Sequence, residues 1–248
     1  MVSWMKNRLL PALLLATLFL ALPLVQAEAV QLSSIKEMVI EAPKGTVYFI
    51  YTDVGHTGSP SGAYDAVAGG ILYGMCSQEQ NEGFDSHQYW VEQQDIPGKL
   101  NLSGKTVVVL GGRLANRVTY YYEWSIFVTP VYVYLNSEYF YLITNSQVTG
   151  EPTKVYSIRI SEVSAGHKDM FVIESFKDSV GNTIFILYGM TWRGTWAAGI
   201  YFKDRIYPDI VQNPANYQGS YFVGIWQDMP DQQGYLDGVP QPEEIAPY

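Results

Sequence analysis

The sequence has few of the side chains that usually cross-link a chain or hold a metal within it. Its 248 residues include one cysteine and three histidines. A disulfide within the chain needs two cysteines, so the fold must be stable without one. The single thiol, Cys76, lies in the apolar run 71–76. This favours a buried, inert side chain, with a disulfide to a second chain as the alternative. No histidine has a companion at zinc-ligand spacing, so a zinc site is not expected.

Charged residues are also scarce, at 16% of the chain, and basic ones are the scarcer kind. Setting aside Lys6 and Arg8 reduces the 15 basic residues to 13, against 24 acidic ones, a net charge of −11. Such a surface repels phosphate backbones, so nucleic acid is not expected as a partner. Aromatic residues, by contrast, reach 15%. This composition favours a folded chain rich in half-buried strands.

Residues 1–29 are typical of a secretory signal peptide. Two basic residues precede an apolar run at 9–25, and small residues suit cleavage after Ala27 or Ala29. The segment predicts an extracellular or cell-surface location. A retained membrane anchor is the alternative, and contact with a membrane is expected only through this segment if it is uncleaved.

Repeated strand–turn–helix order predicts an α/β fold. Three apolar runs rich in β-branched and aromatic residues are each followed by a glycine-bearing turn and a helix-compatible segment. Because these runs are continuous and not alternating, the strands are expected to be buried on both faces of a mostly parallel or mixed sheet with three layers. The strands are expected at 46–53, 106–110 and 183–188, and the helices at 62–80, 114–124 and 194–206.

The middle of the chain predicts a hairpin-rich insertion. Runs at 131–135 and 139–143 are joined by a short polar turn, and further strands are expected at 155–163 and 170–176. We therefore expect one α/β domain over residues 30–227, with a β-rich part at about 128–176. Residues 228–248 are rich in Pro, Gly and acids, which predicts a loop or tail.

The turn after the second predicted strand carries the sharpest motif. Gly111 and Gly112 follow the apolar run 106–110, and Ala115 and Asn116 come next. The glycines suit a tight turn into a helix, with Asn116 bonding to nearby backbone. An anion-binding cradle at the helix N-terminus is the alternative. Dinucleotide spacing is missing and no Walker lysine follows, so the structural turn is preferred.

The run 111–119, Gly-Gly-Arg-Leu-Ala-Asn-Arg-Val-Thr, resembles the G-G-P-x-A-N-x-x-T element of archaeal S-layer and S-layer-like surface proteins. A second run, 188–199, is similar to an element of secreted archaeal proteins of that kind. Arg113 stands where the family usually has Pro, and full S-layer subunits are usually much longer. The resemblance implies an extracellular, non-catalytic envelope domain, with self-association or other envelope proteins as partners.

Glycines at 189, 194 and 199 recur every five residues around Trp192 and Trp196. Such spacing permits close backbone approach, and the tryptophans offer large contact areas. Core or subunit packing is the preferred role. A platform that stacks on sugars or another small ligand is the alternative.

The acidic C-terminal segment is a candidate calcium site. Carboxylates on a flexible loop suit Ca²⁺, but the spacing of a calcium-loop motif is broken, so a solvated acidic tail is the alternative. The candidate ligands are Asp228, Asp231, Asp237 and Glu243, with Glu244 nearby. Apart from Ca²⁺, no cofactor is expected.

Two further stretches of the sequence contain candidate sites. Asn101 begins the only N-glycosylation sequon. The loop 53–61 carries Asp53, His56 and several hydroxyls after a strand, but Pro60 occupies the serine position of a nucleophile elbow. A secreted hydrolase is therefore the least favoured hypothesis. A structural envelope protein that is not an enzyme is preferred, and an extracellular glycan- or small-ligand-binding protein is the alternative.

Overall fold

The computed structural model describes residues 31–41, 45–52, 68–72, 74, 82–85, 102, 104–150, 152–227 and 243–247. The signal segment, the loop 53–61 and most of the acidic C-terminal segment lie outside these residues. Within the described part, no helix is both long enough and apolar enough to span a bilayer.

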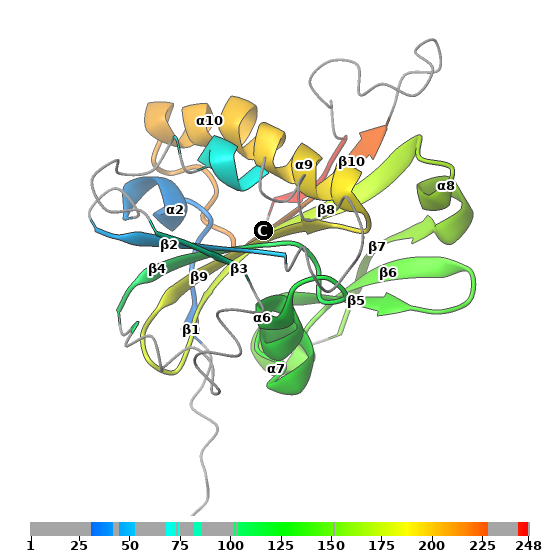
Figure 1. The fold of residues 1–248 in the computed structure, drawn as a ribbon, viewed down its shortest axis with the longest axis horizontal. Coiled ribbons are helices and arrows are strands. Elements are labelled where there is room, and N and C mark those ends of the chain that lie inside the picture. Colours follow the sequence, from blue (N-terminus) through cyan, green and yellow to red (C-terminus); the bar gives the residue numbers. More distant parts are fainter. Residues whose placement is uncertain are drawn as a thin grey trace, which may run out of the picture.

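One large mixed sheet forms the centre of the molecule (Figure 1), which confirms the α/β class. Its strands run in the order β11-β10-β8-β9-β4-β2-β3, and β1 pairs with β8 beside β10. The strands are β1 (Gln31–Leu32), β2 (Val47–Tyr51), β3 (Glu82–Asp85), β4 (Thr106–Leu110), β8 (Lys168–Lys177), β9 (Thr183–Gly189), β10 (Tyr221–Gln227) and β11 (Glu243–Pro247).

One side of this sheet is parallel and the other is antiparallel. Strands β3, β2, β4 and β9 are parallel, whereas β8, β10 and β11 add antiparallel pairs at the other side. Val108 of β4 lies between Phe49 of β2 and Phe185 of β9. Alternate residues of β2, β4, β8, β9 and β10 enter two separate apolar cores, one on each face. Burial on both faces explains the continuous apolar runs in these strands.

Helices cover one face of the sheet (Figure 1). Side chains from these helices join Phe171, Phe185 and Phe222 of the sheet in one core, in which the rings of Tyr201 and Phe222 stack with centroids 5.0 Å apart. The covering elements are α2 (Glu37–Ile40), the helical residues 68–72, α9 (Trp192–Tyr201), the π-helical turn η3 (Phe202–Ile206) and α10 (Tyr207–Gln212).

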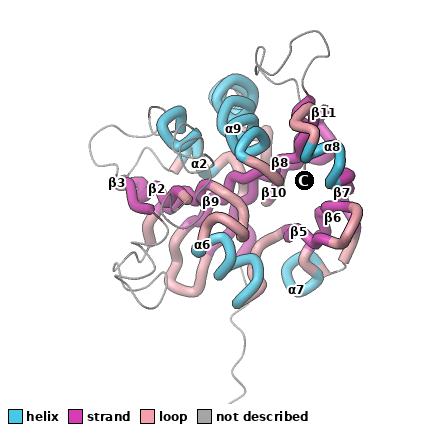
Figure 2. The backbone as a smooth tube through the Cα atoms, turned by 45° about the vertical axis from the view of Figure 1, so that its right-hand side comes forward, coloured by secondary structure: helices cyan, strands magenta, loops and turns pink. Residues whose placement is uncertain are grey.

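In the described part of the chain, the opposite face of the main sheet is not covered by a full helical layer, so the structure differs from the expected three-layer arrangement. Among the described residues, a short helix with a π-helical turn covers part of it, and a second, antiparallel sheet with its adjoining short helices covers another part (Figure 2). The hairpin-rich insertion was therefore predicted correctly, but it takes the place of a helical layer. The elements are α6 (Arg117–Tyr120), η2 (Tyr121–Ser125), β5 (Val131–Leu135), β6 (Tyr139–Thr144), α7 (Ser146–Thr149), β7 (Lys154–Arg159) and α8 (Ile160–Ser164).

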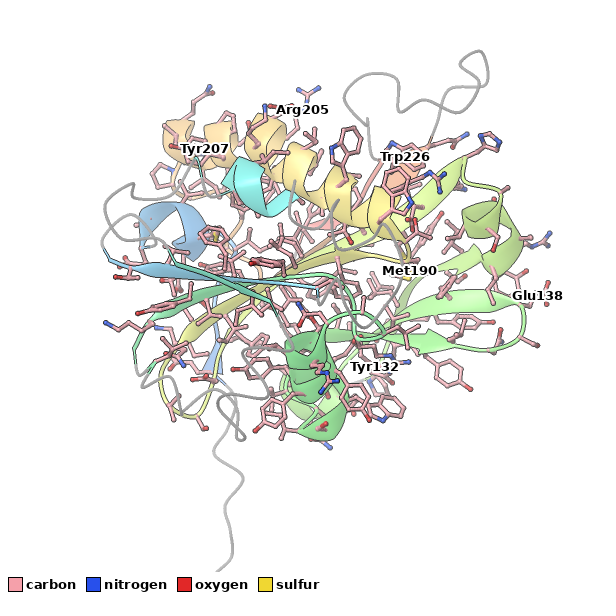
Figure 3. All side chains as sticks on the ribbon, viewed as in Figure 1. Tyr132, Glu138, Met190, Arg205, Tyr207 and Trp226 are labelled. Carbon is pink, nitrogen blue, oxygen red and sulfur yellow. The ribbon has the colours of Figure 1, made fainter. Side chains whose placement is uncertain are left out.

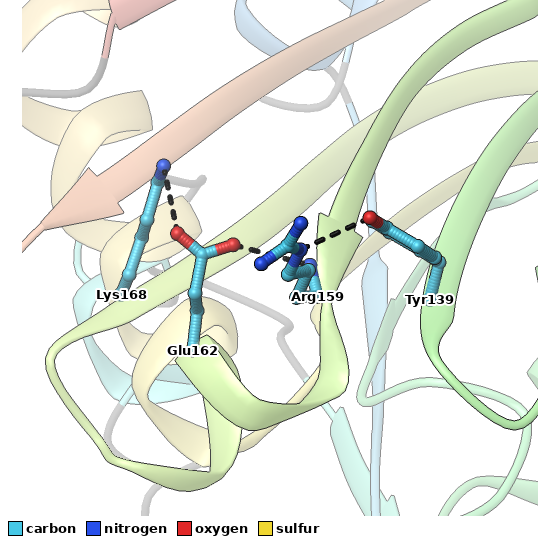
Figure 4. Close-up of polar contacts among 4 residues, drawn as sticks. All are labelled: Tyr139, Arg159, Glu162 and Lys168. Atoms are coloured by element: carbon cyan, nitrogen blue, oxygen red, sulfur yellow. Dashed lines mark hydrogen bonds and ion pairs between the residues drawn. The ribbon is translucent and has the colours of Figure 1, made fainter.

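A chain of polar contacts links the second sheet to β8 (Figure 4). Nε of Arg159 donates to the Tyr139 hydroxyl at 3.0 Å. The Glu162 carboxylate accepts from the Arg159 backbone N–H at 3.3 Å and lies 3.6 Å from the ammonium of Lys168. Exposed pairs of this kind contribute little free energy, so their effect is to orient the β7–α8 corner.

Several element boundaries differ from the predicted ones. The expected strand at 155–163 ends at Arg159, because the Glu162 side chain caps a short helix there. Residues 243–247 were expected in a loop or tail but form β11. Composition disfavours a strand there, but the otherwise open edge of β10 supplies backbone partners.

Two glycines hold the start of α9 against the end of β9. A Cβ atom added at Gly189 would lie 2.2 Å from Cα of Gly194, and one added at Gly194 would lie 2.7 Å from Cα of Gly189. Gly199, the next glycine of the five-residue spacing, faces Ala68. A Cβ atom added at Gly199 would lie 3.1 Å from the Cβ atom of Ala68. The close backbone approach expected from the five-residue spacing is therefore present.

This approach gives a stability prediction. Gly189→Ala should lower the free energy of unfolding by about 3 kcal/mol, because backbone atoms on the facing turn cannot move aside as a side chain would. Urea denaturation measures the change. Gly70→Ala is the matched control, since Gly70 is helical and a Cβ there meets nothing within 4 Å. The control should be neutral or stabilising by up to about 1 kcal/mol. Equal losses for both variants would contradict the prediction.

Candidate functional site

A cavity of about 370 Å³ opens at the carboxyl ends of β4 and β9. Residues 111–115 and 188–192 form two of its walls, and Val133, Leu135 and Phe140 of the second sheet form a third. Figure 3 labels Met190 at this place, between the helical layer and the second sheet. Glu123 and Thr195 complete the lining. The cavity therefore lies where open α/β sheets usually bind ligands.

The wall at 111–115 is shaped by a buried asparagine. Asn116 caps α6, since its Oδ1 accepts from the N–H groups of Val118 and Thr119 at 2.9 and 3.4 Å. Its Nδ2 donates to the carbonyls of Leu110 at 2.8 Å and Ile50 at 3.3 Å, and so joins the ends of β4 and β2. The side chain is fully buried, and all these bonds are to backbone.

The rest of this turn also has a structural explanation. Gly111 has φ +99°, a conformation that favours glycine. Its carbonyl accepts from the Thr119 hydroxyl at 2.7 Å, and its N–H donates to the Leu187 carbonyl at 3.0 Å. The Gly-Gly-x-x-Ala-Asn-x-x-Thr pattern thus forms a strand-to-helix turn, as preferred from sequence. Because Asn116 already accepts from the N–H groups of Val118 and Thr119, fewer N–H groups remain at this helix start to hold a phosphate.

The wall at 188–192 is held by a buried carboxylate. Asp169 of β8 accepts from the backbone N–H groups of Met190, Thr191 and Gly194 at 2.9–3.1 Å, and from the Thr191 hydroxyl at 2.5 Å. Burial raises the pKa of Asp169 to about 6, while the hydrogen bonds from Thr191 and Gly194 oppose that rise. The positive end of α9 is therefore already occupied by a carboxyl group of the chain itself.

A second buried carboxyl group, that of Glu123, lines the cavity. It comes from η2, and its Oε1 accepts from the Val133 N–H at 2.5 Å and from the Tyr188 hydroxyl at 3.1 Å. Neighbouring Glu174 of β8 accepts from the Val131 N–H at 3.3 Å. These two acids satisfy alternate N–H groups along the edge of β5. They join the second sheet to the main one through polar contacts as well as apolar ones.

Two of the residues that line the cavity also carry buried polar atoms without a hydrogen-bond partner among the described residues. Glu123 is 0% exposed, yet its Oε2 has no hydrogen-bond partner among the described residues. The same is true of the buried Nη1 of Arg113. The Arg113 guanidinium itself lies over the ring of Trp124, 4.5 Å from its centroid. Unsatisfied buried polar atoms are costly, so both atoms are expected to gain a partner from water or from a bound molecule.

Burial makes the acids at this site weak. It raises the pKa of Glu123 from 4.5 to about 7, opposed by the Val133 N–H, by Arg113 and by Tyr188. Burial also raises the pKa of Glu174 well above its usual range, and the nearby Glu123 raises it further. The pKa of Tyr188 rises for the same reasons. Below about pH 7 the Glu123 carboxyl group is therefore mostly protonated and does not neutralise the positive charge of Arg113.

The mouth of the cavity is apolar. Leu114 is 82% exposed and Leu135 is 40% exposed, and both line the opening. Trp124, 51% exposed, lies beside it under Arg113. Trp192 also lines the cavity, and the guanidinium of Arg193 covers its ring at 4.6 Å. An apolar rim around a polar interior suits a small amphipathic molecule.

The structure brings together only some of the predicted site residues. Gly111, Gly112, Ala115 and Trp192 line the cavity, whereas Asn116 holds the turn behind it. Trp196 is partly buried one helical turn beyond Trp192 and is not part of the described lining. Other predicted residues lie outside the described ones: Asp53, His56, Asn101, Asp228, Asp231 and Asp237. The backbone of Glu243 is described in β11.

Sequence reasoning missed the buried acids. Glu123 and Glu174 each stand alone in an apolar and aromatic run. Such isolated acids are a usable signal, because a charged residue on a buried strand or helix requires a partner or a raised pKa. The described residues contain no group of three His, Cys, Asp or Glu side chains that could hold a metal ion.

No protein-family model matches this chain, and a search of curated proteins finds no significant match.

The buried acids predict that stability falls as pH rises. Between pH 4.5 and about 7 the folded chain keeps the Glu123 proton that the unfolded chain has lost. Stability from this group is therefore complete below pH 4.5 and lost as pH rises through about 7, an effect on the order of 3 kcal/mol. Glu174 and Asp169 act in the same direction.

Urea denaturation at pH 5 and pH 8 measures this effect. Glu123→Gln should reduce the difference between the two values by on the order of 3 kcal/mol, because glutamine does not titrate. The exposed Glu138 offers a matched control, and Glu138→Gln should leave the difference unchanged. A Glu123→Gln protein with the full pH dependence of the wild type would refute the role given to this group.

Proposed function

We propose that this chain is a non-catalytic binding protein that holds a small amphipathic molecule in the cavity at the ends of β4 and β9. The observation that carries the proposal is one cavity combining an apolar mouth with buried polar atoms, Glu123 Oε2 and Arg113 Nη1, that lack partners among the described residues. A volume of about 370 Å³ is within the range of small-molecule sites.

The position of the cavity supports the same proposal. Its walls are turns fixed by Asn116 and Asp169, both buried, so little conformational entropy is lost when a ligand binds. Trp192 supplies a large flat surface at the wall. A ligand with an apolar body would contact this ring, together with Phe140 and Leu135 of the second sheet.

The wider role we propose is that of an extracellular, S-layer-like envelope protein. The leader at 1–29 and the Gly-Gly-x-x-Ala-Asn-x-x-Thr run support this role. An exposed apolar surface next to the cavity supports it too, because Tyr120, Trp124 and Ile126 are 40–51% exposed and suit packing against another envelope component. Calcium bridging by the acidic C-terminal segment belongs to the same proposal.

A ligand panel tests the binding role. Thermal unfolding is followed with eight-carbon amphiphiles that carry a carboxylate, an alcohol, an amine or a glucose head group. At least one should raise the Tm of the wild type, and Ala115→Leu should abolish that rise by filling the cavity. Val211→Ala, at a 59% exposed position on α10, serves as control and should respond as the wild type does. If no amphiphile raises the wild-type Tm, the binding role is wrong.

Fractionation of native cells tests the envelope role. The mature chain should be enriched in the detergent-resistant envelope, and a calcium chelator should release it. Release without a chelator would remove calcium from the proposal. A freely soluble monomer in the medium would contradict the envelope role and leave the binding role standing.

A further inference from the structure

We propose that the ligand of this cavity is a carboxylic acid with an apolar body, whose carboxylate is held by Nη1 of Arg113 and Oε2 of Glu123. This inference rests on the proposed binding function and names its ligand class. Both groups line the cavity, and neither atom has a hydrogen-bond partner among the described residues.

Arg113 is placed to bind an anion. Its guanidinium is fixed over the Trp124 ring at 4.5 Å, so one face of the group is covered while the buried Nη1 is left without an acceptor. The described residues form no ion pair with it within 4.0 Å. A ligand carboxylate would supply the missing acceptor, and guanidinium–carboxylate hydrogen bonds are among the strongest in proteins.

Glu123 provides the second donor. Its Oε1 already accepts from the Val133 N–H and the Tyr188 hydroxyl, so a proton on the carboxyl group resides on Oε2. The protonated Oε2 can then donate to the ligand carboxylate. Burial and the neighbouring acid Glu174 both favour this protonated form. The charged and titratable groups that act on Glu123 are Arg113 before α6, Tyr188 of β9 and Glu174 of β8.

The charges at the cavity exclude the opposite ligand. An alkylammonium could accept no hydrogen bond from Arg113, and the guanidinium charge would repel it. Binding such a ligand at Glu123 would also require ionising a carboxyl group next to Glu174. A neutral alcohol would fill the apolar part but leave one of the two polar atoms poorly satisfied.

Calorimetry with octanoate, octanol and octylamine at pH 6 tests the ligand class. Octanoate should bind most tightly, and Arg113→Gln should weaken it by about tenfold to a hundredfold. Arg193→Gln is the matched control, since Arg193 lies over Trp192 at 4.6 Å but is not part of the described lining. It should leave octanoate binding unchanged. Circular dichroism establishes that both variants fold, and Arg113→Lys, which keeps the charge, should show an intermediate affinity.

Glu123→Gln gives a second and independent test. Glutamine keeps a donor at the Oε2 position but cannot ionise, so the variant should bind octanoate with the same affinity at pH 6 and pH 8.5. The wild type should lose about tenfold or more of its affinity over that range, because the ionised Glu123 repels the ligand. A wild-type affinity that does not change with pH would overturn the role of Glu123.

The remaining outcomes separate the inference from the function on which it rests. If octanol or octylamine binds as tightly as octanoate, and Arg113→Gln has no effect, the carboxylic-acid class is wrong while the binding function stands. If none of the three binds to the folded wild type, and the glucose-headed amphiphile does, the ligand class is wrong and a sugar ligand replaces it. If no probe binds, the binding function fails as well.

Discussion

Two buried polar side chains satisfy the backbone at the points where β4 and β9 end, and the arrangement of this end of the molecule depends on them. A strand buried on both faces leaves free N–H and carbonyl groups where it stops, and water cannot reach them. Asn116 bonds to backbone groups of β2, β4 and α6, and Asp169 binds the N–H groups that begin α9. The two turns that form walls of the cavity are thus both fixed by interior contacts.

The two cavity acids extend the same principle to the second sheet. The edge of β5 directs N–H groups toward the main sheet, and Glu174 and Glu123 accept from them. A carboxyl group can do this with one oxygen, which leaves the other oxygen for a different partner. For Glu123, which lines the cavity, this second oxygen is buried and has no hydrogen-bond partner among the described residues. Glu123 thus bonds to the second sheet and also lines the cavity.

Much of the fold could be predicted from the sequence, because continuous apolar runs and glycine turns report local conformation. The strands at 106–110 and 183–188 and the hairpin at 131–143 are confirmed. The structural role of Asn116 was also predictable, since it depends mainly on its own turn. The cavity was not, because Arg113, Glu123 and Phe140 meet only through tertiary packing. Strand β11 was missed because pairing with a free edge depends on the neighbour more than on its own composition.

Arg113 connects the local motif with this tertiary site. In the run that resembles an S-layer element, it occupies the one position where the sequence departs from that pattern. The turn is held by Gly111, Asn116 and Thr119, so position 113 contributes little to its geometry. A long cationic side chain can therefore be accommodated there without disturbing the turn, and in this chain it lies at the cavity and over Trp124. Residues that hold the turn and a residue that lines the cavity in this way share six consecutive positions, 111–116. Fold and binding specificity would then depend on different positions of the same turn.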